Sequence, residues 1–109
     1  MKRDPEVVES SGNVFADLGL PDSEELLVKA ELARQIIGII GERELTQTRA
    51  AALLGTTQPK VSDLVRGELS GFSIERLIRF LNALGRDVQI VVRDADGPGP
   101  RGSLTVEAA

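Results

Sequence analysis

The chain has 109 residues, of which 41% are hydrophobic and 28% charged, and this balance predicts one globular domain. It contains no Cys, His, Trp or Tyr. Their absence excludes disulfides, thiolate nucleophiles, histidine bases, and zinc sites built on Cys or His. Since carboxylates, Lys, Arg, Ser and Thr rarely suffice for catalysis in so short a chain, we expect no enzyme, no cofactor and no metal. We also expect a cytoplasmic protein, because the N-terminal residues lack the apolar core of a signal peptide and no stretch is a membrane span.

The net charge of −4 is an average over unlike parts of the chain. Residues 1–44 hold five basic and ten acidic groups, residues 45–93 hold seven and four, and residues 94–109 hold one and three. A basic middle between acidic flanks favours a central segment that faces phosphates and an acidic arm that faces something else. Chance clustering of charges is the alternative.

The N-terminal half predicts an arm, a helical turn and a long helix. Residues 1–12 are polar and predict a flexible arm. Residues 13–19 predict one short helical turn that begins at Asn13 and stops at Gly19. A longer helix begins at Asp22 and starts to end at Gly41. Its expected apolar stripe consists of Leu26, Ala30, Ala33, Ile37 and Ile40, widened by Leu27 and Ile36.

Three more helices and one strand are predicted after residue 45. Thr46 caps a helix that stops at Gly55, Thr57 caps one that stops at Gly67, and Ser73 caps one that stops at Gly85. Residues 87–93 alternate between apolar and polar side chains and predict a β-strand. Residues 94–109 predict a flexible tail. The expected fold is mainly α, with about five helices and one C-terminal strand in a domain over residues 13–93.

The stretch from residue 45 to residue 67 carries the strongest functional pattern. Counting from Gln47, the small residue Ala51 falls four positions later, where two crossing helices need one. Gly55 falls eight positions later, where a tight turn needs a positive φ. The apolar residues Ala50, Leu54, Val61 and Leu64 occupy the positions that would be buried. This register predicts a helix-turn-helix whose second helix enters the major groove of DNA. An ordinary helical hairpin is the alternative.

The segment Leu45–Gly67, with its Gly-Thr-Thr-Gln run at residues 55–58, resembles the XRE, or phage-repressor, class of helix-turn-helix regulators. Residues 11–19 and 80–88 are similar to a narrower branch, the HigA-type antitoxins. The resemblance spans roughly residues 11–93. It implies a sequence-specific DNA-binding transcriptional repressor, and an antitoxin that represses its own operon and neutralises a ribonuclease-like toxin. A stand-alone regulator without a toxin and a protein-interaction adaptor that retains the fold are the alternatives.

The resemblance also implies a set of DNA-contacting residues. An amide is both donor and acceptor, so Gln58 can bond adenine bidentately, while Gln47 can reach a phosphate. The candidates are Gln47, Thr57, Gln58, Lys60, Ser62, Asp63, Arg66, Ser70 and Ser73. Asp63 departs from the family pattern: it would repel phosphate, accept a hydrogen bond from cytosine N4, or pair with Arg66. Pro59 also replaces a polar side chain, so base specificity does not carry over.

Two kinds of protein partner are expected. A lone strand leaves its backbone groups unpaired, so we expect antiparallel pairing with a second copy through Val88, Gln89, Ile90, Val91 and Val92. Such a homodimer would present two recognition helices to a palindromic operator. Packing of residues 87–93 as coil on their own domain is the alternative. For a small basic toxin, the candidate contacts are Val14, Phe15, Leu18, Glu24 and Glu25; docking of these residues on the chain's own helices, or simple solvation, is the alternative.

Overall fold

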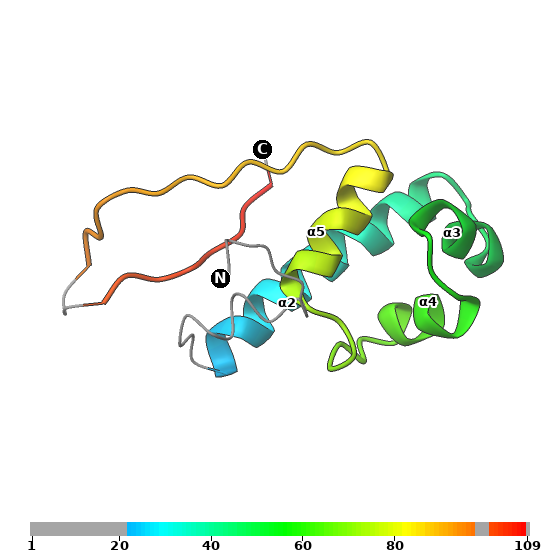
Figure 1. Ribbon diagram of the computed structural model, residues 1–109, viewed down its shortest axis with the longest axis horizontal. Helices are drawn as coiled ribbons and strands as arrows, with labels where there is room; N and C mark the ends of the chain where they lie inside the picture. The colour runs from blue at the N-terminus through cyan, green and yellow to red at the C-terminus, as the bar shows by residue number, and fades with distance from the viewer. Residues whose placement is uncertain (1–21, 98–100, 109) are drawn as a thin grey trace, which may run out of the picture.

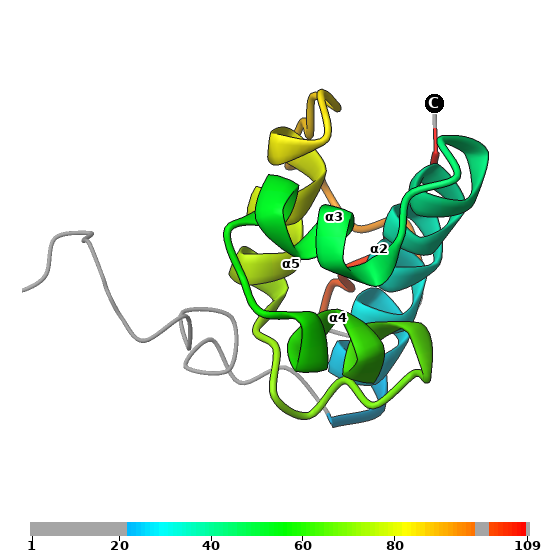
Figure 2. The same ribbon diagram turned by 90° about the vertical axis from the view of Figure 1, so that its right-hand side faces the viewer.

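The computed structural model describes residues 22–97 and 101–108, and this part of the chain is all-α. Its four helices are α2 (Asp22–Glu42), α3 (Gln47–Leu54), α4 (Gln58–Val65) and α5 (Ile74–Ala83). The long helix α2 packs along α5, and the short helices α3 and α4 pack against each other at one end of this pair (Figures 1 and 2). The flexible N-terminal segment predicted at residues 1–12 and the helical turn predicted at residues 13–19 lie outside the described residues.

The predicted starts of the last three helices are confirmed by their capping hydrogen bonds. The hydroxyl oxygen of Thr46 accepts from the backbone N–H of Arg49 at 3.1 Å, and that of Thr57 accepts from Lys60 N–H at 3.4 Å. At the start of α5, Ser73 accepts in the same way at 3.0 Å. Each cap satisfies a backbone donor that the first helical turn leaves without a partner.

The apolar stripe predicted for α2 is confirmed at Ala33, Ile36 and Ile40 but is wrong in the first half of the helix. The buried side chains of this helix are Val28, Leu32, Ala33, Ile36, Ile39 and Ile40. In contrast, Leu26 and Leu27 are 59% and 72% exposed, and Ala30 is exposed as well. Apolar residues lie on more than one side of the first half of this helix, and packing against the other helices buries the side of Val28 and Leu32 rather than that of Leu26 and Leu27.

The core lies between α2 and α5 and continues into α3 and α4. Its most deeply buried large side chains are Ile36, Val61, Leu64, Leu77 and Leu84, which come from three helices and the end of α5. Burial of each such side chain contributes roughly 1.5–3 kcal/mol to folding. The helix-turn unit α3–α4 is therefore fixed to the long helices through its own buried residues.

The predicted strand at residues 87–93 does not form within this chain. No strand occurs between residues 22 and 97 or in residues 101–108, and the segment from residue 86 to residue 97, here called the arm, runs extended away from α5 (Figure 1). Val88 packs against the core, but Ile90, Val91 and Val92 are 66%, 68% and 92% exposed. A strand exists only as part of a hydrogen-bonded ladder, and the described chain offers the arm no partner.

The chain then turns back toward α2. Residues 101–108, here called the return segment, run back from the far end of the arm toward the helices (Figure 1). Leu104 and Val106 are half-buried against the core, and the Leu104 N–H donates to Glu24 Oε2 at 2.5 Å. The Arg101 guanidinium lies 3.4 Å from the other oxygen of that carboxylate. The last part of the sequence thus touches the first turn of α2.

Candidate nucleic-acid interface

A tight turn sets the relative orientation of α3 and α4. Gly55 ends α3 in the left-handed conformation, with φ at 72°, and its N–H donates to the Ala51 carbonyl. Ala50 and Ala51 are buried, which lets neighbouring helices approach α3 closely. Because Val61 and Leu64 are also buried, α4 turns one side into the core and leaves the opposite side open.

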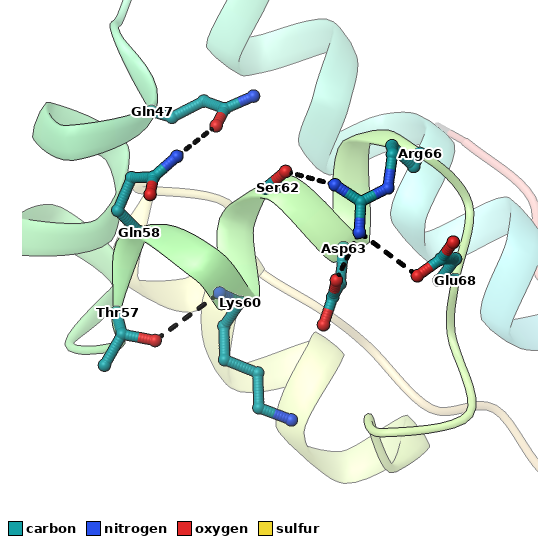
Figure 3. A network of polar contacts seen from close by, with 8 residues as sticks. All are labelled: Gln47, Thr57, Gln58, Lys60, Ser62, Asp63, Arg66 and Glu68. Atoms are coloured by element: carbon teal, nitrogen blue, oxygen red, sulfur yellow. Dashed lines mark hydrogen bonds and ion pairs between the residues drawn. The ribbon is translucent and has the colours of Figure 1, made fainter.

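Two glutamines join the beginnings of the two helices. Gln58 Nε2 donates to Gln47 Oε1 at 2.6 Å, and both side chains lie on the open surface (Figure 3). One N–H and the carbonyl oxygen of Gln58 are left for another ligand, and so are the amide donors of Gln47. Both residues were predicted from the sequence to contact DNA, and in the structure their side chains are hydrogen-bonded to each other.

Lys60 extends from the side of α4 toward the loop before α5. Its ammonium donates to the Gly71 carbonyl at 3.2 Å and lies 5.0 Å from the centre of the Phe72 ring. A lysine held over an aromatic face by a carbonyl is part of the domain's own packing. In this arrangement Lys60 contacts the loop rather than standing free in solution.

The end of α4 carries a polar network around one guanidinium. Arg66 Nη1 donates to Ser62 Oγ at 2.5 Å, while Nη2 donates to Asp63 Oδ1 at 2.7 Å and to Glu68 Oε1 at 3.2 Å (Figure 3). The pKa of Arg66 is raised above its ordinary value, first by the hydrogen bond to Glu68 and then by the charges of Glu68 and Asp63. Of the three roles that the sequence left open for Asp63 (repulsion of phosphate, a bond from cytosine N4, and pairing with Arg66), the structure shows the pairing with Arg66.

The remaining candidate residues divide between capping and exposure. Thr57 and Ser73 use their hydroxyl oxygens to cap α4 and α5, and each hydroxyl retains a proton to donate. Ser70 is exposed in the loop between these helices. Arg76, at the start of α5, donates to Thr56 Oγ1 at 3.2 Å and so joins α5 to the turn between α3 and α4.

Comparison with known proteins places this geometry in a family. The model of the family described as "Helix-turn-helix domain" matches residues 14–93. The chain belongs to the helix-turn-helix domain family. A solved structure described as a candidate XRE family transcriptional regulator is 45% identical in sequence, with a TM-score of 0.76 over 82% of this chain and 100% of that one. Among curated proteins, no sequence matches this chain significantly. The predicted helix-turn-helix is therefore confirmed, with α4 as its second helix.

Only some of the residues that the sequence analysis proposed to face a toxin belong to the described part of the chain. Val14, Phe15 and Leu18 lie outside the described residues. Glu24 is bound to the return segment, and Glu25 lies 3.4 Å from the Lys29 ammonium on the next turn of α2. Both carboxylates of this helix-turn-helix protein are thus engaged by its own chain.

The sequence analysis did not identify one residue of the polar network at the end of α4, which is Glu68. Glu68 was not a candidate because it follows Gly67, outside the helical pattern that located the others. It reaches Arg66 because Gly67 adopts a φ of 79° and the Glu68 N–H donates back to the Asp63 carbonyl at 2.9 Å. Only the folded turn brings this carboxylate to the end of α4.

The described residues also lack a membrane-spanning helix and a cluster of metal ligands. None of the helices is long and apolar enough to cross a membrane. Within residues 22–97 and 101–108, no three or more acidic side chains gather closely enough to hold a metal ion.

Proposed function

We propose that this protein is a sequence-specific DNA-binding transcriptional repressor that acts as a dimer on a palindromic operator. The observation that carries the proposal is the Gln47–Gln58 pair on the open side of the helix-turn-helix. The bond to Gln47 fixes the Gln58 amide while leaving one N–H and the carbonyl oxygen for N7 and N6 of adenine. Gln47 keeps its own N–H groups for a phosphate.

The charge distribution supports this function. The segment from residue 45 to residue 93, which contains the helix-turn-helix, has seven basic and four acidic groups, although the whole chain is acidic. A local positive potential favours binding to DNA even when the net charge does not. The similarity to a structure described as a candidate XRE regulator points the same way. Since the family match covers most of the chain, we infer that it acts by occupying a promoter.

Dimerisation through the arm is the second part of the proposal. Ile90, Val91 and Val92 are exposed one after another, and the backbone of residues 87–93 takes part in none of the backbone hydrogen bonds of the described chain. Such an edge is a template for strand pairing, and an identical arm related by a two-fold axis offers the same edge. A dimer formed in this way would present two α4 helices to two operator half-sites.

Replacement of Gln58 by Ala tests the DNA-binding surface. We expect Gln58→Ala to reduce discrimination between operator and random DNA by roughly 1–3 kcal/mol, the value of one bidentate base contact. Operator sequences selected from the protein's own promoter region and from a random pool would be titrated at several salt concentrations. Gln35→Ala, which truncates a glutamine on α2, is the matched control and should bind as the wild type does.

The outcome for the wild type decides between regulator and adaptor. Affinity for DNA should fall steeply as salt rises, because binding releases counterions from the phosphates. If the wild-type protein shows no salt-sensitive binding and selects no sequence, the repressor proposal is wrong. The adaptor alternative would then be favoured.

A narrower proposal places this repressor in a toxin–antitoxin pair. Its support is the similarity of residues 11–19 and 80–88 to HigA-type antitoxins and the ten acidic against five basic groups of residues 1–44. An acidic surface can cover the basic surface of a protein that binds RNA. Co-expression with a basic ribonuclease-like protein encoded beside this gene should rescue growth. Toxicity that persists in the presence of this chain would exclude the antitoxin role and leave the repressor proposal intact.

A further inference from the structure

The side of α4 opposite its buried residues carries Ser62, Asp63 and Arg66. Val61 and Leu64 are buried, and at 100° per residue these three positions fall on the far side of the helix. The side chains of Asp63 and Arg66 are 39% and 54% exposed. If the helix enters the major groove, as the proposed function requires, this is the side that meets the base edges.

The contacts of Arg66 limit what it can bind. A guanidinium offers five N–H groups, and every adjacent pair suited to bidentate binding includes Nη2. Here Nη2 already donates to both Asp63 and Glu68, and Nη1 donates to Ser62. No adjacent pair remains for guanine or for a phosphate. With one positive and two negative groups, the cluster also bears a net negative charge and so disfavours phosphate.

Asp63 has the opposite property, because one of its oxygens is left over. Arg66 holds Oδ1, and Oδ2 accepts none of the hydrogen bonds found within the described chain. The adjacent guanidinium offsets part of the negative charge of Asp63 and Glu68, which lessens their repulsion from the phosphates that line the groove. An acceptor held in place by a charge-assisted bond is well prepared to receive one donor.

We propose that Asp63 reads a cytosine through the N4 amino group and that Arg66 is its positioning residue. In the major groove cytosine presents the N4 donor, guanine and thymine present acceptors at O6, N7 and O4 that would repel the carboxylate, and adenine places its N7 acceptor beside its N6 donor. This inference rests on the proposed function and adds to it the identity of one base pair of the operator. Under this proposal Arg66, one of the candidate DNA contacts, acts through Asp63 and does not touch the DNA itself.

The test is selection of binding sites from randomised DNA by the full-length protein and its variants. The wild type should select cytosine at one position of each half-site. Asp63→Asn should lose this preference by about 5- to 150-fold, the value of one base contact, and gain preference for adenine, which an amide bonds at N6 and N7. Asp63→Ser, which cannot reach as far, should lose the preference without gaining another.

Variants of the two neighbours separate positioning from charge. Arg66→Ala should relax selection at the same position only, with Arg66→Lys restoring part of it, and should leave the slope of log affinity against log salt unchanged. Glu68→Gln is the matched control, because Glu68 bonds the same guanidinium from the loop that follows α4; its selected sequences should equal those of the wild type. Thermal unfolding of each variant checks that the domain remains folded.

Three outcomes would overturn the inference. If Asp63→Asn and Asp63→Ser select the same sequences as the wild type, Asp63 reads no base, while the repressor proposal stands. A salt slope that falls by about one unit in Arg66→Ala would show that Arg66 contacts a phosphate. A wild-type protein that selects no sequence at all contradicts the repressor proposal itself, and the assignment of Asp63 falls with it.

Discussion

The helix-turn-helix and the arm show two ways in which one chain uses its apolar residues. In α3 and α4, apolar residues at helical spacing are buried, and the turn and caps satisfy the ends of the helices. In the arm, three successive apolar residues from Ile90 to Val92 are exposed, and the backbone lacks a ladder. The helix-turn-helix therefore buries its apolar residues within one chain, whereas the arm has the exposed apolar residues and unpaired backbone of one half of an interface.

The largest loss of stability is expected on substitution of Leu64, which is fully buried in α4. Leu64→Ala should lower the free energy of unfolding by about 2–5 kcal/mol, because it removes buried methyl groups and leaves a cavity. Leu53→Ala, at a 45% exposed position of α3, is the control and should cost far less. Urea unfolding followed by circular dichroism measures both. Equal losses would mean that Leu64 is not part of a packed core.

A smaller effect is expected at the turn between the two helices. An added Cβ at Gly55 or Gly38 meets nothing within 4 Å, but only Gly55 has a positive φ. Gly55→Ala should therefore destabilise the domain by about 1 kcal/mol, since an L-residue is strained there. The same change at Gly38, inside α2, should stabilise it by about 0.5–1 kcal/mol. The same sign of change in both thermal melts would contradict the conformational explanation.

The smallest effect on domain stability is expected in the arm, where the effect on assembly is largest. Val91→Pro removes a backbone donor at a 68% exposed position, so the unfolding free energy should change by less than about 0.5 kcal/mol. Sedimentation should nevertheless show a monomer, and operator affinity should fall. Val91→Thr retains the N–H and should remain dimeric. A wild-type protein that is monomeric at micromolar concentration would exclude the arm as the dimer interface.

The sequence predicted what depends on local chemistry. Thr46, Gly55, Thr57 and Ser73 mark helix ends through hydrogen bonds and backbone conformations that involve only a few neighbouring residues, and all four were predicted correctly. The helix-turn-helix was predictable for the same reason, because its register lies within 23 successive residues.

What depends on distant contacts was not predictable. The buried side of α2 is chosen by its packing against α5, so helical spacing alone could not distinguish the stripe through Val28 from the one through Leu26. At the candidate site, the contacts of the Lys60 ammonium with the Gly71 carbonyl and the Phe72 ring could not be predicted either. No local pattern of α4 contains those partners.

The bond between Leu104 and Glu24 joins residues 80 positions apart, which has a consequence for the order of folding. In an unfolded chain, this contact would have to close a loop of that length. Once the helices have formed, Leu84 is already buried beside α2, and only 20 residues of free chain remain to be closed. Two halvings of loop length reduce the entropic cost of closure by about 1.2 kcal/mol. We therefore expect the return segment to dock after the helices have formed, on a surface that they have already built.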